Sequence, residues 1–400
     1  MEAIGMSADE QIVSLDLERF EESMALSQFA FQFKRSTSEL EEIKYNFIHE
    51  PADRWAVLID GQLAAQAAVL NLQTYIAGRP FQMGGVAGVA TWPEYRRQGL
   101  VGKLLVHALQ EMRVKGQTLS FLAPFAFGFY RKFGWGTYTD AKTYTLLVNQ
   151  LPKRTTYSGK IERVSGYERV AEIYEVYASQ FNGSLQRSPL WWERRVSKRK
   201  PGQIALFTDI DGNGQGYLIY EVAKRELNIH EFIYLNEEAR SALWSFVGQH
   251  DSMIERVVVN APVDDMLTDL LPDPRVKQEI VPYFMARIVD VEAFIKLYPF
   301  TGGEEEQFYL KVTDTYAPWN TGEYMIHIDV KGEVNVSRDP QLFKPDNALE
   351  LEIGDLSTLM LGYRTTAQLS SLNRIRGPLH AINRLHRRIP ERTTYLLDFF

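Results

Sequence analysis

An apolar run that continues through a basic, glycine-containing turn into a helical pattern constrains this chain more than any other feature. The run covers residues 86–91, the turn covers residues 95–99 (YRRQG), and the helical pattern begins at Leu100. The first N–H groups of a helix lack partners, and the helix dipole favours an anion there. Gly99 lets the backbone come close without a Cβ, and the two arginines add charge-assisted hydrogen bonds. The turn therefore predicts a site for a phosphate-bearing cofactor.

Length and composition narrow the class of protein. A chain of 400 residues predicts two to four domains, and 45% hydrophobic with 24% charged residues is typical of globular proteins. The chain has no cysteine, which excludes disulfides, thiolate metal sites and an acyl-cysteine intermediate. Because the histidines are dispersed, we expect no metal site. The net charge of −7 disfavours nucleic acid and is compatible with a cationic substrate.

The sequence predicts neither secretion nor a membrane span. Met1–Glu10 lacks the apolar core of a secretory signal, and no uncharged apolar stretch approaches the roughly 20 residues that a membrane span needs. We therefore expect a cytoplasmic protein. The basic run 194–200 ends at Pro201-Gly202, and we interpret it as an exposed loop.

Residues 1–150 predict one α/β unit. The expected order is strand, two helices, three antiparallel strands, helix, strand, helix, strand, and the second helix begins at a capping box, Ser38-x-x-Glu41. We expect strands at 11–15, 54–59, 63 onward, 83–91, 118–123 and 137–148, with helices through 20–29, 38–47, 100–115 and 127–133. Gly84, Gly85 and Gly88 suit a bulge and the close approach of another chain.

The turn and this element order resemble the GNAT N-acetyltransferases, whose acetyl-CoA loop has the pattern Gln/Arg-x-x-Gly-x-Gly/Ala. Val101 stands at the last position of that pattern, and Gly102 comes one residue late. The resemblance implies acetyl-CoA as co-substrate, without a metal. It assigns cofactor binding to the backbone of the strand end and of the turn, which are Val89, Ala90, Thr91, Arg96, Arg97, Gln98, Gly99, Leu100, Val101 and Gly102.

A second motif resembles the GNAT segment beside the thioester sulfur. It consists of Tyr130 followed by Phe133-Gly134-Trp135. A tyrosine hydroxyl with an ordinary pKa of about 10 can share a proton with a thiol of pKa near 8.5 when the two lie within hydrogen-bond reach. Tyr130 is therefore the candidate general acid for the CoA thiolate, although a core tyrosine would give the same pattern.

Residues 151–287 predict a degenerate copy of the same fold. We expect helices at 166–181, 189–195 and 236–247 and strands at 203–208, 216–222 and 226–234. Where the copy should carry its phosphate loop, acidic residues begin a helix instead, and these would repel a pyrophosphate.

Residues 288–400 resemble a sterol-carrier-protein module, through a Pro-Trp-Asn turn at 318–320 and an Asp-Leu-Ser-x-Leu segment at 355–359. We expect helices at 291–297, after 353, after 364 and at 379–385, with strands at 307–314, 322–330 and 349–353. The module could bury a lipid or form a wall of the active site. The fold class is thus α+β, with tandem GNAT folds at 1–150 and 151–287 followed by a carrier-like α/β domain at 288–400.

This domain combination resembles the Eis N-acetyltransferases, in which the α-carboxylate of an aromatic C-terminal residue acts as the base. The resemblance carries that role to Phe400. It implies acetyl transfer to primary amines, of aminoglycosides or of peptide lysines, with Asp398 or Glu41 as possible acids of the acceptor pocket. It also implies a homo-hexamer built as a trimer of dimers. Two other classes stay open, a lipid-binding protein with a vestigial transferase and a transferase that uses aminoacyl-tRNA.

Overall fold

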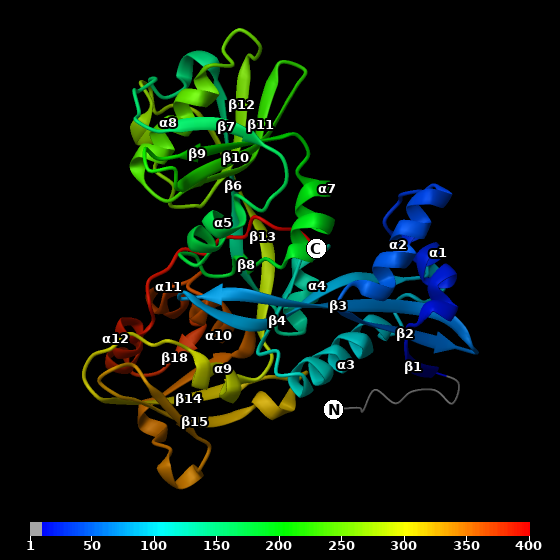
Figure 1. Cartoon of the computed structure of the whole chain (residues 1–400). Helices are drawn as coiled ribbons and strands as arrows, with labels where there is room; N and C mark the ends of the chain where they lie inside the picture. Colours follow the sequence, from blue (N-terminus) through cyan, green and yellow to red (C-terminus); the bar gives the residue numbers. More distant parts are fainter. Residues whose placement is uncertain (1–9) are drawn as a thin grey trace.

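The computed structural model describes residues 10–400, in which two sheets form the framework (Figure 1). Residues 1–9, for which the sequence predicts no secretory signal, lie outside the described part. A 13-stranded sheet follows the order β1-β2-β3-β4-β5-β13-β6-β12-β11-β10-β9-β7, with β8 paired to β3, and a five-stranded sheet follows the order β16-β15-β14-β17-β18. Both sheets carry helices, so the predicted α+β class is confirmed.

The first unit, residues 10–150, has the element order that the sequence predicts. Its strands are β1 (Glu10–Ser14), β2 (Ala52–Ile59), β3 (Gln62–Ile76), β4 (Arg79–Thr91), β5 (Leu119–Leu122) and β6 (Gly136–Leu147). Its helices are α1 (Phe20–Ala30), α2 (Thr37–His49), α3 (Leu100–Val114) and α4 (Phe127–Lys132).

The capping box of α2 was predicted two residues too late. The Glu39 N–H donates to Ser36 Oγ at 3.4 Å, and the Ser36 N–H donates to the Glu39 carboxylate at 2.8 Å. Ser36 has the extended backbone of an N-cap, whereas Ser38 already lies inside the helix. Both serines have a glutamate three residues on, so the pattern alone did not separate them.

The second unit shares one sheet with the first. Its strands are β7 (Lys160–Val164), β8 (Leu185–Gln186), β9 (Gln203–Thr208), β10 (Gly214–Ala223), β11 (Glu226–Tyr234), β12 (Arg256–Ala261) and β13 (Lys277–Ile288). Its helices are α5 (Ala171–Ala178), α6 (Pro189–Trp191), α7 (Ser197–Arg199) and α8 (Glu237–Gly248), with a π-helical segment at Trp192–Val196. β13 was missed because Pro282 interrupts it, yet it pairs with β5 at one end and with β6 along most of its length.

Two other predictions for this unit were wrong. The helix expected over 166–181 covers only Ala171–Ala178, because the residues before it form turns. The basic run 194–200 is no exposed loop: it lies in the π-helical segment and α7, and Val196 within it is buried. Figure 1 shows α7 next to the C-terminus of the chain.

The C-terminal module packs its own sheet under four helices. Its strands are β14 (Glu306–Thr313), β15 (Gly322–Ile328), β16 (Val334–Ser337), β17 (Ala348–Glu352) and β18 (Ile375–Arg376). Its helices are α9 (Val291–Leu297), α10 (Ile353–Met360), α11 (Thr366–Ser371) and α12 (Leu379–Arg388). The short strands β16 and β18 were not expected, since two to four residues carry little periodic signal.

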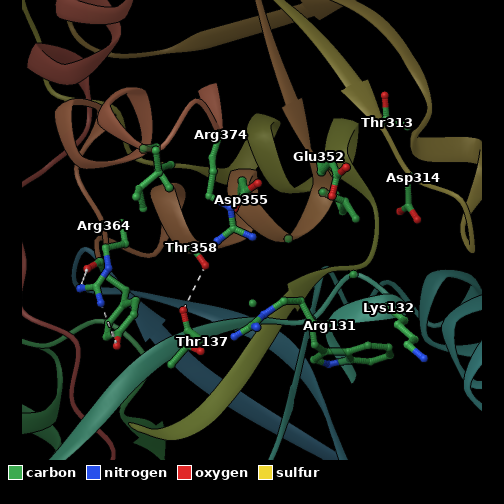
Figure 2. Close-up of a pocket in the computed structure, with 18 of the residues that line it drawn as sticks. Arg131, Lys132, Thr137, Thr313, Asp314, Glu352, Asp355, Thr358, Arg364 and Arg374 are labelled. Atoms are coloured by element: carbon green, nitrogen blue, oxygen red, sulfur yellow. Dashed lines mark hydrogen bonds and ion pairs between the residues drawn. The ribbon is translucent and has the colours of Figure 1, made fainter. Parts of the chain in front are cut away.

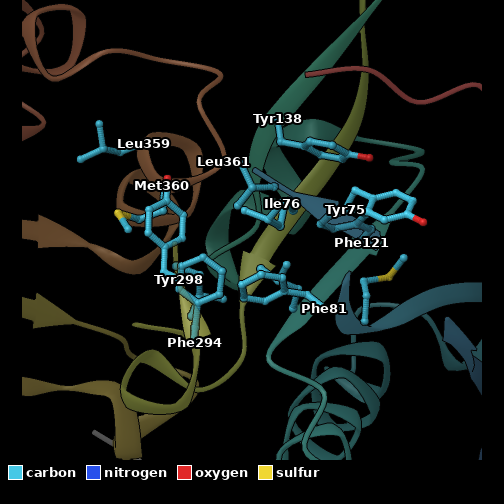
Figure 3. Packing of buried hydrophobic residues seen from close by; sticks show 14 of the residues in the cluster. Tyr75, Ile76, Phe81, Phe121, Tyr138, Phe294, Tyr298, Leu359, Met360 and Leu361 are labelled. Carbon is cyan, nitrogen blue, oxygen red and sulfur yellow. The ribbon is translucent and has the colours of Figure 1, made fainter. Parts of the chain in front are cut away.

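A single hydrophobic cluster joins all three segments. It includes Phe81 and Phe121 of the first unit, Phe284 of the second, and Phe294 and Leu359 of the C-terminal module. Figure 3 shows Phe81 of β4 beside Phe294 of α9 and Tyr298, with Met360 of α10 next to Tyr298. Burial of apolar surface across these junctions therefore fixes the segments relative to one another.

A buried ion pair also ties the C-terminal module to α4. Arg287 at the end of β13 donates to the Asp314 carboxylate at 2.5 Å and to the Phe133 carbonyl oxygen, and its side chain is fully buried. Its guanidinium also lies 5.3 Å from the centre of the Trp135 ring. Arg287 therefore connects the turn after α4 to the C-terminal module.

The last residues of the chain run back across the sheet. The Asn182 N–H donates to the Thr393 carbonyl at 2.9 Å, and Ser184 Oγ donates to the Tyr395 carbonyl at 2.8 Å. Tyr283 Oη of β13 then donates to the carbonyl of Asp398 at 3.1 Å. The tail thus leaves the C-terminal module and ends on elements of the two GNAT units.

Four buried charges fix the end of this tail. Arg187 contacts the carboxylates of Asp398 and Glu231 at 3.0 and 2.6 Å, and Lys200 also pairs with Glu231. Trp191 Nε1 donates to Asp398 at 2.9 Å. Burial alone would raise the pKa of Glu231, but the positive charges of Arg187 and Lys200 outweigh it and lower this pKa to about 2. Glu231 therefore stays ionised in the folded protein at neutral pH.

Asp398→Asn should destabilise the fold, because it leaves the buried Arg187 with one carboxylate fewer. We expect the free energy of unfolding to fall by about 3–5 kcal/mol, measured by urea denaturation. Glu255→Gln, which breaks the exposed pair with Arg225, is the matched control and should leave the urea midpoint unchanged. Equal midpoints for Asp398→Asn and the wild type would contradict a structural role of the buried cluster.

Candidate active site

Strands β4 and β5 separate where the predicted cofactor strand begins. Their parallel pairing runs from Met83 opposite Leu119 to Val86 opposite Leu122, where β5 ends. β4 continues to Thr91, and among the described residues β3 is its only strand neighbour over 87–91. Val89, Ala90 and Thr91 therefore border a gap in the sheet whose backbone groups can pair with an extended ligand.

A bulge marks the start of this open segment. The register between β3 and β4 shifts between Gln66 and Ala68, so that two residues of β4, Gly88 and Val89, lie opposite Ala67. Gly88 has φ +61°, which a residue with a side chain rarely adopts. The bulge re-aims the backbone of β4 at the point where β5 has ended.

The turn that follows β4 has the geometry of an anion site. Arg97 and Gly99 both have left-handed backbones, with φ of +64° and +80°, and residues 96–99 are exposed. The first helical hydrogen bond of α3 runs from the Lys103 N–H to the Gly99 carbonyl at 3.1 Å. The N–H groups of Leu100, Val101 and Gly102 consequently point out of the helix start without helical acceptors. Arg96, Arg97 and Gln98 lie beside these amides in the same turn.

The departure of Val101 from the family pattern has a packing explanation. A Cβ on Gly102 would lie 3.0 Å from the ring of Phe133, so glycine is needed at the position after the pattern ends. Val101 is half-buried on the neighbouring side of α3. The small residue of this turn is thus shifted by one place to accommodate the aromatic residue that follows α4.

Tyr130 lies in the core beside the open end of β4. It is 3% exposed and belongs to the same hydrophobic cluster as Val86 and Leu122, the last paired residues of β4 and β5. Edge-on contacts with Phe125, Phe129 and Trp135 surround its ring, with centroids 5.2 to 6.4 Å apart. Burial raises the pKa of its phenol above the ordinary value, so the hydroxyl stays protonated and can donate.

Phe400 reaches the same strand from the other side. A Cβ on Gly85 would lie 2.8 Å from the Phe400 ring, so only glycine lets the tail come this close. The ring packs against Phe284 at 5.1 Å and Trp191 at 6.2 Å and is 7% exposed. Of the three glycines predicted to admit another chain, only Gly85 meets the protein's own C-terminal residue, whereas Gly84 meets Met112 of α3 and Gly88 has open space beside it.

Tyr130 and Phe400 lie on opposite faces of the sheet. A Cβ on Gly84 would meet Met112 of α3, whereas a Cβ on Gly85 meets Phe400, and successive residues of a strand point to opposite faces. Tyr130 shares the α3-side cluster with Met112. Phe400 therefore lies on the face that α1 and α2 cover, since Leu26 of α1 packs on the alternate β2 residues Ala56 and Leu58.

The acids proposed for the acceptor pocket are not both available. Asp398 is buried and committed to Arg187 and Trp191, so it anchors the tail and cannot meet an incoming amine. Glu41 is exposed on α2. The sequence also gave no sign of Arg187, Glu231 and Tyr283, which hold the tail, because each is an isolated residue far from its partners along the chain.

The turn at 96–102 and the open edge of β4 offer the groups that acetyl-CoA needs for binding. Its pyrophosphate needs unpaired N–H donors and positive charge, which the turn at 96–102 supplies. Its extended pantetheine needs an unpaired strand edge, which residues 87–91 supply. A Cβ built on Gly88 or Gly99 would meet no atom within 4 Å, so space is open beside both positions. The residues present therefore fit the cofactor.

A separate polar pocket of about 380 Å³ lies between α4 and the C-terminal module (Figure 2). Figure 2 shows Arg131, Arg374 and Asp355 directed toward it, and Arg374 pairs with Asp355 at 3.2 Å. Charged walls do not suit an alkyl chain, so this pocket gives no support to a lipid-binding role.

Residues 10–400 contain neither a cluster of metal-binding side chains nor a helix that could span a membrane. No group of three or more histidine, aspartate or glutamate side chains gathers there in a way that could hold a metal ion. No helix in that part of the chain is long and apolar enough to cross a membrane.

Family models match three successive parts of the chain. Models described as acetyltransferase (GNAT) domains match residues 11–138 and 183–288, and a sterol carrier protein domain model matches residues 291–397. The first match contains the turn at 96–102 and Tyr130, and the third ends three residues before the C-terminus. GNAT domains use acetyl-CoA, which agrees with the fit described above.

Whole-chain comparisons give the same result. A probable N-acyltransferase of Enterococcus faecalis V583 is 30% identical, with a TM-score of 0.91 over 98% of this chain and 99% of that chain. N-acetyltransferase Eis of Mycobacterium tuberculosis (strain ATCC 25177 / H37Ra) is 25% identical over 82% of this chain and 84% of its own length. Eis1 of Mycobacterium abscessus shares the fold, with 21% identity and a TM-score of 0.80 over 98% of this chain and all of that chain. The chain therefore belongs to the Eis-like family of GNAT N-acetyltransferases, with two GNAT domains followed by a sterol-carrier-protein domain.

Proposed function

We propose that this enzyme transfers an acetyl group directly from acetyl-CoA to a primary amine, with Phe400 as base and Tyr130 as acid. One observation carries the proposal: the terminal residue and the buried tyrosine flank the open end of β4 from opposite faces of the sheet. A base on one face and an acid on the other suit a displacement in which the amine enters on one side and the thiolate leaves on the other.

Each group has a distinct task in this proposal. Backbone amides at 97–102 bind the pyrophosphate, and those of Val89, Ala90 and Thr91 bind the pantetheine arm and polarise the thioester carbonyl. The Phe400 carboxylate orients the ammonium of the acceptor and takes its proton, directly or through a water molecule. Tyr130 donates its phenolic hydrogen to the sulfur. When bound, acetyl-CoA supplies the activated acetyl group as a thioester.

The structure supports the carboxylate assignment through its packing. Phe284, Trp191 and the Gly85 backbone enclose the terminal ring, and the ion pair of Asp398 fixes the backbone two residues earlier. A carboxylate on a backbone held in this way loses little entropy when it meets an amine.

Aminoglycoside amines are the acceptors that the family resemblance predicts, and lysine side chains in peptides are the alternative. The lipid-binding alternative has less support, because the turn at 96–102, the open strand edge and Tyr130 are all intact. A transferase for aminoacyl-tRNA would need a basic face for RNA, and the net charge of −7 disfavours it. We also propose domain limits at 150 and 287, a homo-hexamer built as a trimer of dimers, and a cytoplasmic location.

Tyr130→Phe should lower kcat for acetyl transfer by about 10²–10⁴-fold with little change in KM for acetyl-CoA, because it removes the proton donor and keeps the ring. The pKa of Tyr130 is raised, so its ionisation adds no loss of activity below pH 10. Wild type and variant should therefore show parallel pH profiles of kcat between pH 8 and 10. The reaction is monitored by the release of free CoA thiol.

Tyr298→Phe is the matched control for this variant. Tyr298 is equally buried, and its hydroxyl has no hydrogen-bond partner among the described residues. This control should retain wild-type kcat. If Tyr130→Phe also retained it, Tyr130 would be a core residue and not the acid.

Converting the C-terminal carboxylate of Phe400 to an amide should lower kcat by about 10²-fold or more, because the base is lost while the ring stays in place. The protein would be made by ligating a synthetic C-terminal peptide, with the ligated carboxylate form as control. Phe400→Tyr keeps the carboxylate and should stay active. An amide with normal kcat and an unchanged urea midpoint would show that the base lies elsewhere.

A further inference from the structure

A cleft of about 700 Å³ lies between α2 and the basic run at 194–199, which adjoins the C-terminal tail. One wall is the side of α2 around Asn46, and the other is the basic run in the π-helical segment and α7. The run touches the tail directly, since the Arg199 guanidinium lies 4.8 Å from the centre of the Phe399 ring. Arg195 lies 5.6 Å from the Trp191 ring, which itself packs on Phe400. The basic wall of the cleft therefore adjoins the aromatic side chains that surround the C-terminal residue.

The walls of the cleft carry an excess of positive charge. The six cationic side chains are Arg35, Arg54, Arg194, Arg195, Lys198 and Arg199, and the three carboxylates are Glu39, Glu42 and Glu50. The formal excess is three positive charges, on a protein whose net charge is −7. A basic cleft on an acidic protein is a local feature that overall composition does not produce.

Every carboxylate in the cleft already has a cationic partner. Glu50 contacts two of them, Arg54 at 3.3 Å and Arg195 at 2.5 Å. Glu39 contacts Arg35 at 2.8 Å, and Glu42 pairs with Lys198. These acids are therefore committed, and the cleft offers no free carboxylate from its walls to a second ammonium group of a substrate.

Two arginines that line the cleft have no ion-pair partner among the described residues. Within the described chain, neither Arg194 nor Arg199 has a carboxylate at ion-pair distance. Nη1 of Arg194 is shielded from solvent and has no hydrogen-bond partner there, although its guanidinium lies 5.4 Å from the Tyr45 ring. A guanidinium presents a planar fork that matches a carboxylate or phosphate. Arg199 is exposed on the cleft wall and presents such a fork to an anion, whereas Nη1 of Arg194 must turn outward to reach one.

From this charge pattern we infer that the natural acceptor is an amine that also carries an anion, a carboxylate or a phosphate, which Arg194 and Arg199 bind while the amine meets the Phe400 carboxylate. The inference rests on the proposed function and names its substrate class. It ranks acceptors differently from the aminoglycoside expectation, because a polycation would bring further ammonium groups against a wall of arginines.

Three amines of equal chain length test this inference. They are 5-aminopentanoate, n-pentylamine and cadaverine, whose far ends are anionic, neutral and cationic. We expect kcat/KM for CoA release to be about 10- to 100-fold higher for the anionic amine than for the neutral one, as for a hydrogen bond to a charged group, and lowest for cadaverine. Glucosamine 6-phosphate and glucosamine provide the same comparison for a phosphate. The ratio of kcat/KM within each pair tells whether the carboxylate or the phosphate is preferred. The preference should weaken as salt is raised, because the cleft is open to solvent.

Arg194→Gln and Arg199→Gln identify the groups responsible. Each should reduce the ratio of kcat/KM between the anionic and the neutral amine, and the double variant should bring that ratio close to one. Arg225→Gln, at an exposed arginine of the second unit, is the matched control and should keep the wild-type ratio. Urea midpoints would show that the variants are folded.

The outcomes separate the inference from the proposed function. Equal rates for the three amines, or faster transfer to cadaverine and aminoglycosides, would overturn the anionic acceptor and leave the transferase mechanism intact. A wild-type preference that survives in the double variant would also overturn it, because the anion would then bind elsewhere. CoA release from none of the amines would instead contradict the proposed function itself.

Discussion

The buried contact between Arg187 and Asp398 is the interaction on which the rest of the site depends. It joins the second GNAT unit to the tail of the C-terminal module, and it lies two residues before the end of the chain. Burying these charges costs free energy, which their mutual attraction and the bonds to Glu231 and Trp191 offset. Such a cluster tolerates one arrangement of its members. The position of Phe400 on β4 follows from that arrangement.

The first GNAT unit supplies the cofactor side of the site, and the remaining chain supplies the other side. β4 loses β5 as a neighbour after Val86, and the turn after β4 presents unpaired amides. The second unit, which lacks such a turn, contributes Arg187 and the cationic wall of the cleft. The C-terminal module holds Arg287 of β13 through Asp314, and Arg287 in turn braces the turn after α4; the module also supplies the tail that ends at Phe400. The degenerate and carrier-like domains thus become parts of one transferase.

The positive charge of the cleft does not match the aminoglycoside acceptors that the family resemblance predicted. A transferase for polycations would benefit from free carboxylates on its acceptor side, yet Glu39, Glu42 and Glu50 are all paired here and Asp398 is buried. Membership of the family gives the reaction, whereas the side chains of the acceptor cleft decide which amines are accepted. In the cleft that we propose for the acceptor, the basic run at 194–200 supplies four of the six cationic side chains.

The sequence by itself determined the local elements and the chemistry attached to them: the turn at 95–102, Tyr130 on its short helix, and the order of strands and helices in the first unit. These depend on periodicity and turn residues within a few positions, which a single sequence displays. Only the tertiary structure decided that Phe400 packs on Gly85, that Asp398 anchors the tail, and that the basic run forms a cleft wall. The pairing of β13 with β5 and β6 was likewise decided only by the tertiary structure. Each joins residues more than a hundred positions apart, and such contacts arise from packing and buried charge that no local pattern records.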